Sequence, residues 1–181
     1  MNKNLKQDLI NEYKNIFEGT FEAGGGYNFR YFHGLRTMKY CEQFLKLPQF
    51  KSKSINKDAL LIASLFSDVG KVKAINKKKE LVYGSAGDRD HEAIGARIIT
   101  SYLSKHIDDQ ELINLVSQII SEQEGTKQTT TESRLAKDAD RLDNYGFIKI
   151  WRTITYANYS KRNIDRLKEF LPTRYLSSHH F

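Results

Sequence analysis

Apolar residues recur at helical spacing along almost the whole chain, and no other feature constrains the fold as strongly. Only two prolines, Pro48 and Pro172, interrupt the pattern, and proline is the residue that most strongly breaks a helix. The sequence contains no internal repeat, and its one strand-like fragment, "ELVYG", is too short to found a sheet. The sequence therefore predicts an all-α protein, a bundle of about seven to eight helices.

The helix boundaries follow from caps, glycines and prolines. Glycines at positions 24–26 have no strand before them, so we expect a flexible loop there. Gly70 is suited to cap the end of a buried helix, and Gly146 interrupts the pattern later in the chain. The predicted helices cover about 5–16, 29–45, 57–69, 88–106 or 90–106, 108–120 or 109–120, 131–143, 147–154 and 160–172.

Length and composition favour one soluble domain. The chain has 181 residues, which is enough for one domain spanning 1–181 with a substantial core. No apolar run reaches the roughly 18 residues that cross a membrane, and the Lys-rich start has no signal-peptide core. The single Cys41 fits a reducing compartment. We therefore expect a cytoplasmic protein with no membrane association.

The charge balance suggests an anionic partner. The chain has 29 Lys and Arg residues against 22 Asp and Glu, a net charge of +7. Nucleotides, other phosphorylated small molecules and nucleic acid would all suit this excess. Only charge supports nucleic acid, because no nucleic-acid motif, P-loop or dinucleotide fingerprint appears.

Four polar residues lie on the apolar faces of separate predicted helices. Asp68 follows the apolar run "LLIASLF" and lies within about 20° of Leu61 on the helical wheel. By the same count His33, His91 and Asp140 lie on the apolar faces of their own helices. Two histidines and two carboxylates are thus expected to point toward the interior.

A buried carboxylate must be neutralised, ion-paired or bound to a cation. One interpretation satisfies each group separately: His33 by a backbone carbonyl, Asp68 by Arg36 or Arg141, and Asp140 by a helix N-terminus. The other places one shared cation among them. His and Asp ligands together suit Zn, Mn, Fe, Co or Ni better than Ca.

These residues resemble a known family. His33, the pair Ser67-Asp68 in "LFSDVGK" and Asp140 in "KDADRLD" are similar to the H…HD…D pattern of the HD superfamily of metal-dependent phosphohydrolases. The likeness covers about residues 28–158. Finer details, above all "DADRLDNYGFIKIWRT", resemble the YpgQ/YedJ-like subgroup of nucleoside-triphosphate pyrophosphohydrolases.

The resemblance implies a helical bundle around a central metal and phosphate pocket. It assigns His33, Asp68 and Asp140 as ligands of a divalent metal, which would be Mn, Fe, Zn, Co, Ni or Mg. A position equivalent to His91 lies beside the substrate phosphates or a second metal in relatives.

Two positions depart from the family pattern. Ser67 stands where the HD pair has its histidine, and Gln123 stands where another histidine is expected. A hydroxyl is a weak ligand beside imidazole, so both changes should weaken metal binding.

Other residues have candidate roles in phosphate-ester hydrolysis. A metal lowers the pKa of bound water and withdraws charge from phosphoryl oxygens. Asp68 or Glu92 could receive the proton of the water, with His91 nearby. The candidate phosphate ligands are Arg36, Lys71, Arg89 and Arg141, although each basic residue could instead form an ordinary ion pair.

Two functions remain open. The first is an HD phosphohydrolase acting on nucleotides, by pyrophosphohydrolysis of nucleoside triphosphates. The alternative is a degenerate HD module that binds a nucleotide without hydrolysing it. Ser67 and Gln123 favour the second; His91 and the intact "DADRLD" favour the first.

Overall fold

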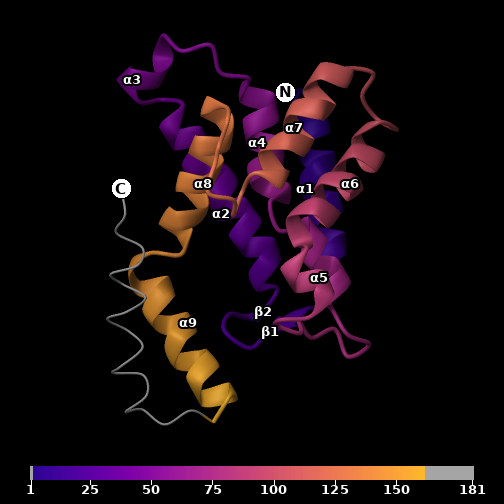
Figure 1. The fold of residues 1–181 in the computed structure, drawn as a ribbon, viewed down its shortest axis with the longest axis vertical. Coiled ribbons are helices and arrows are strands. Elements are labelled where there is room, and N and C mark those ends of the chain that lie inside the picture. Colours follow the sequence, from indigo (N-terminus) through magenta and orange to yellow (C-terminus); the bar gives the residue numbers. More distant parts are fainter. Residues whose placement is uncertain (1, 162–181) are drawn as a thin grey trace.

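Helices form nearly all of the regular structure in the computed structural model, which describes residues 2–161 (Figure 1). The long helices are α1 (Lys3–Phe17), α2 (Phe29–Phe44), α4 (Lys57–Phe66), α6 (His91–Leu103), α7 (Gln110–Ser121), α8 (Thr131–Asp143) and α9 (Gly146–Tyr159). The short elements are α3 (Pro48–Lys51), α5 (Ala86–Arg89), the 3-10 helix η1 (Val69–Ala74), β1 (Phe21–Glu22) and β2 (Gly26–Tyr27). The predicted all-α bundle is confirmed. The predicted last helix, 160–172, falls outside the described residues beyond its first two positions.

Helix α4 lies at the centre of the bundle. It contacts α1, α2, α7 and α8, which explains why its sequence is apolar on almost every side. Tyr13 of α1, Met38 of α2 and Val116 of α7 share one hydrophobic core with it. The C-terminal end of this buried helix places Ser67 and Asp68 in the interior.

The chain changes conformation at that end. We expected a helix over 57–69 capped by Gly70, but α4 ends at Phe66 and Asp68 leaves the helical region (φ −99°, ψ 9°). A Cβ on Gly70 would lie 1.8 Å from the carbonyl oxygen of His91, so glycine is needed for close packing of η1 on α6. This contact brings Asp68 and His91 into the same region.

Of the two predicted starts of the next helix, Asp88 and Asp90, the structure supports Asp90, whereas Asp88 belongs to a separate short helix, α5. Ser85 caps α5, and its Oγ accepts a hydrogen bond from the Asp88 backbone nitrogen at 3.3 Å. Helix α6 begins separately at His91, and the side chain of Asp90 makes no capping bond. The division places His91 at a helix N-terminus next to η1.

Glycines 24–26 do not form the flexible loop that we expected. They lie in and beside the turn that joins β1 to β2, with Phe21 paired to Tyr27. This small hairpin carries the buried carboxylate of Glu22. The hairpin therefore contributes to the interior charges described below.

Helix α9 forms as predicted and extends away from the bundle (Figure 1). The side chains that identified it in the sequence are exposed: Phe147 by 82% and Trp151 by 59%. Its Arg152 points instead toward the hairpin and bonds Glu22. None of the helices within residues 2–161 is both long and apolar enough to cross a membrane.

Candidate functional site

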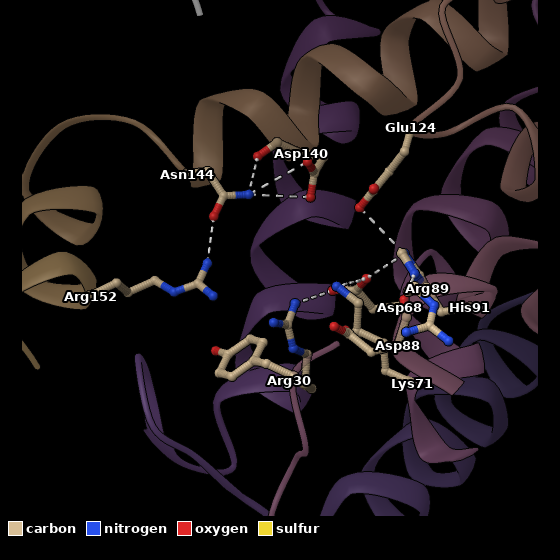
Figure 2. Close-up of a pocket in the computed structure, with 11 residues that line it drawn as sticks. Arg30, Asp68, Lys71, Asp88, Arg89, His91, Glu124, Asp140, Asn144 and Arg152 are labelled. Carbon is tan, nitrogen blue, oxygen red and sulfur yellow. Dashed lines mark hydrogen bonds and ion pairs between the residues drawn. The ribbon is translucent and has the colours of Figure 1, made fainter. Parts of the chain in front are cut away.

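A polar pocket opens where α2, η1, α6, α8 and α9 approach one another (Figure 2). Its volume is about 440 Å³. It is lined by Arg30, Asp68, Lys71, Tyr83, Asp88, Arg89, His91, Glu124, Asp140, Asn144 and Arg152. Most of these side chains are charged, which is typical of a site for a charged ligand.

His33 lies behind this pocket on α2 and is fully buried. Its Nδ1 is 2.6 Å from Oδ2 of Asp143, which is also fully buried. Asp143 further accepts hydrogen bonds from Nε and Nη2 of Arg36, at 2.5 and 2.9 Å. Burial acts to raise the pKa of Asp143, but His33 and Arg36 outweigh it and lower that pKa. An ionised Asp143 fixes the proton of His33 on Nδ1 and directs Nε2 toward the pocket.

The Nε2 atom of His33 faces two more carboxylates. It lies 3.1 Å from Oδ1 of Asp140 and 3.4 Å from Oδ2 of Asp68. This nitrogen is buried, and no atom within residues 2–161 partners it with hydrogen-bond geometry. Burial acts to lower the pKa of His33, but the surrounding carboxylates raise it to about 8. The structure thus brings the three predicted metal ligands together at a point that attracts a proton or a cation.

Asp68 is neutralised by two basic side chains. Nη1 of Arg30 donates to Oδ2, and Nζ of Lys71 lies 3.0 Å from Oδ1. Burial acts to raise the pKa of Asp68, but Arg30 and Lys71 hold it well below its usual value. The suggested partners Arg36 and Arg141 were wrong: Arg36 bonds Asp143, and Arg141 lies 3.9 Å from Asp138.

Arg30 lines the pocket but is not among the site residues predicted from the sequence. It lies three positions before His33, and therefore on the same face of α2, which is a signal that could have found it. Its Nε and Nη2 contact the two oxygens of Glu22 at 2.5 and 2.6 Å. Glu22 also accepts from Arg152 at 2.6 Å and from Tyr83. No periodic pattern marks Glu22, because it belongs to a two-residue strand.

His91 lines the pocket on the side opposite α9. Its Nδ1 is 2.7 Å from the carbonyl oxygen of Asp88, while Nε2 lies 3.4 Å from Oε1 of Glu124 and 3.6 Å from Oδ1 of Asp68. Nε2 is buried without a hydrogen-bond partner. Glu92 does not line the pocket; its carboxylate accepts a hydrogen bond from the backbone nitrogen of Glu124. Glu92 therefore positions Glu124, which the sequence analysis did not single out.

The candidate phosphate ligands divide into two groups. Lys71 and Arg89 line the pocket, whereas Arg36 and the exposed Arg141 do not. Arg152 of α9 lines the pocket as well, with Nη1 donating to Oδ1 of Asn144 at 2.6 Å. No sequence signal marks Arg152, because an arginine on an amphipathic helix ordinarily faces solvent.

Ser67 and Gln123 are both buried, but neither lines the pocket. The Ser67 hydroxyl donates to the backbone oxygen of Ser64 at 3.3 Å. Oε1 of Gln123 is buried without a hydrogen-bond partner. Ser67 and Gln123 therefore do not replace the imidazoles that the family pattern has at these two positions.

The side chains of His33, Asp68 and Asp140 are of types that bind divalent cations, and their polar atoms point toward one another. An orphaned imidazole nitrogen and two carboxylates converge, and a buried carboxylate behind the imidazole orients it, as around many metal-binding histidines. Within residues 2–161, however, no group of three or more His, Cys, Asp or Glu side chains is arranged to hold a metal as it stands. Arg30 and Lys71 form ion pairs with the carboxylate oxygens of Asp68, which are the atoms that a metal would have to bind.

Comparison with known protein families gives a match. The model of the HD domain family matches residues 30–145. This range includes the three predicted metal ligands His33, Asp68 and Asp140. No curated protein and no solved structure matches the chain significantly.

Proposed function

Because the chain belongs to the HD domain family, a superfamily of metal-dependent phosphohydrolases, we propose that its pocket hydrolyses a nucleotide. The observation that carries the proposal is the convergence of His33 Nε2 with Asp68 and Asp140 beside a highly charged pocket. His33, Asp68 and Asp140 would hold a divalent metal. When bound, it would lower the pKa of a water and withdraw charge from phosphoryl oxygens.

The charges of the pocket support a metal-dependent reaction. Its lining has the carboxylates of Asp68, Asp88, Glu124 and Asp140 and the cations of Arg30, Lys71, Arg89 and Arg152. These charges balance, so a triphosphate with several negative charges needs a further positive charge. A divalent cation is the simplest source of that charge.

Side chains of the chain would perform the remaining tasks. Lys71, Arg89 and Arg152 approach the pocket from η1, α5 and α9 and would bind phosphate oxygens. His91 Nε2 faces the pocket between Asp68 and Glu124 and is suited to accept a proton. Glu92 would act indirectly, by holding Glu124.

The finer assignments rest on the sequence. Likeness to the nucleoside-triphosphate pyrophosphohydrolases supports cleavage of pyrophosphate from a triphosphate. We also propose that residues 1–181 form one domain and that the protein works in the cytoplasm.

A hydrolysis assay tests the proposal. The chain is incubated with nucleoside triphosphates and Mn²⁺, and release of phosphate and pyrophosphate is measured. We expect metal-dependent release that Asp140→Asn reduces by at least about 100-fold, since the asparagine cannot supply an anionic ligand. Arg97→Gln, on the exposed face of α6 away from the pocket, is the control and should retain activity. No product above background, with every common nucleotide and metal, would refute hydrolysis.

A second candidate is a module that binds a nucleotide without hydrolysing it. It is favoured because Asp68 already pairs with Arg30 and Lys71, and Ser67 supplies no imidazole. The same samples distinguish the two: nucleotide binding without product identifies the module.

A further inference from the structure

Asp68 is the carboxylate on which the proposed centre depends, and two cations already bind it. Nη1 of Arg30 donates to Oδ2, while Nζ of Lys71 lies 3.0 Å from Oδ1. Arg30 is 5% exposed and Lys71 is 9% exposed, so water screens neither pair strongly. A carboxylate paired on both oxygens attracts a metal much less than a free one does.

Arg30 has a second carboxylate partner of its own. Its Nε and Nη2 contact Glu22 at 2.5 and 2.6 Å, independently of Asp68. Glu22 is 2% exposed and is anchored to α9 by Arg152. Arg30 would therefore remain paired, and would not become an isolated buried charge, if it released Asp68.

Within residues 2–161, no Arg or Lys side chain is paired with the other two ligands, which instead pair with each other, His33 Nε2 lying 3.1 Å from Oδ1 of Asp140. Nε2 of His33 is buried without a hydrogen-bond partner, and the side chain of Asp140 is 31% exposed. Besides its contact with His33, Asp140 accepts long hydrogen bonds from the side-chain amide of Asn144, at 3.4 and 3.5 Å. Competition for the centre is thus concentrated on Asp68.

We propose that Arg30, assisted by Lys71, is a built-in cation that competes with a divalent metal for Asp68 and sets the metal affinity of the centre. This inference rests on the proposed function in taking His33, Asp68 and Asp140 as the ligands. The metal-free centre is then charge-balanced and stable, and metal binds only by displacing Arg30 from Asp68. Glu22 keeps the guanidinium neutralised when that happens.

Manganese titration of variants tests the inference. Free Mn²⁺ is followed by electron paramagnetic resonance, without nucleotide, for the wild type, Arg30→Met, Lys71→Met and the double variant Glu22→Gln/Arg30→Met. The double variant removes the Glu22 carboxylate together with its cation Arg30; Arg152 then loses its bond to Glu22 but keeps the one to Asn144. Thermal unfolding identifies the variants that fold. We expect the double variant to bind Mn²⁺ at least about 10-fold more tightly than the wild type, and Lys71→Met to bind it more tightly as well.

Arg89→Met is the matched control. Arg89 lines the same pocket, but its guanidinium donates to the carbonyl oxygen of Gly84 and not to Asp68. Its loss should change the Mn²⁺ affinity by less than about 3-fold, as expected of an exposed charge in water.

Each outcome decides the matter. Tighter Mn²⁺ binding in the Asp68-partner variants supports the inference even if no variant hydrolyses nucleotides, in which case only the proposed function fails. Equal affinities in wild type and variants overturn it. The inference is also overturned if no folded variant binds Mn²⁺, because removing the cations paired with Asp68 would then not free it to bind a metal.

Discussion

At the scale of single residues, Asp143 determines how His33 is presented to the pocket. It lies one helical turn after Asp140, and its carboxylate accepts from Nδ1 of His33 at 2.6 Å. The sequence places Asp143 near the apolar face of its helix but cannot tell which residue of another helix it meets. Local spacing predicts faces within one helix, whereas contacts between helices depend on packing.

Replacing Asp143 should weaken the metal centre. Asp143→Asn removes the charge that fixes the proton of His33 on Nδ1, and loss of such an outer partner typically costs about 10–100-fold in metal affinity. We expect a decrease of this size in Mn²⁺ affinity, measured in the Glu22→Gln/Arg30→Met background, where binding is predicted to be tightest. Asp138→Asn, exposed on the same helix, should leave the affinity unchanged. Equal affinities of the two variants would show that Asp143 does not support His33.

At the scale of elements, the close contact between η1 and α6 brings the site together. The predicted helix over 57–69 ends early here and the next long helix begins at His91, where Gly70 packs directly on the backbone. Propensity and capping signals could not reveal this change, since it depends on a contact between segments about 20 residues apart in sequence. Sequence signals therefore predict the helices themselves better than their ends.

A methyl group at this contact should destabilise the protein. In Gly70→Ala the new Cβ would lie 1.8 Å from the His91 carbonyl oxygen and 2.7 Å from the Gly95 nitrogen, and neither backbone atom can move without shifting a helix. We expect a loss of about 1–3 kcal/mol or more in the free energy of unfolding, measured with urea. Gly125→Ala is the control, because its nearest new contact is at 3.6 Å. A similar small effect of both substitutions would contradict a tight contact at Gly70.

At the scale of the whole molecule, the sequence predicted the bundle and the faces of its polar residues well. His33, Asp68 and His91 are buried as expected, whereas the side chain of Asp140 is 31% exposed. The three proposed ligands come together from α2, from the segment between α4 and η1, and from α8. What could not be predicted was how the interior charges pair. Arg30 with Asp68, and Arg152 with Glu22, join segments whose proximity depends on the complete fold.

The central claim is that His33, Asp68 and Asp140 form a cation site inside a phosphate-binding pocket. The most direct measurement is the anomalous difference density of Mn²⁺ in crystals of the wild-type chain grown with millimolar Mn²⁺ and a non-hydrolysable nucleoside triphosphate. We predict one manganese peak bound by His33 Nε2 and the carboxylates of Asp68 and Asp140, with the triphosphate beside Lys71 and Arg152. No manganese at this position, with the Arg30 guanidinium still paired to Asp68 and the triphosphate bound elsewhere, would contradict the account.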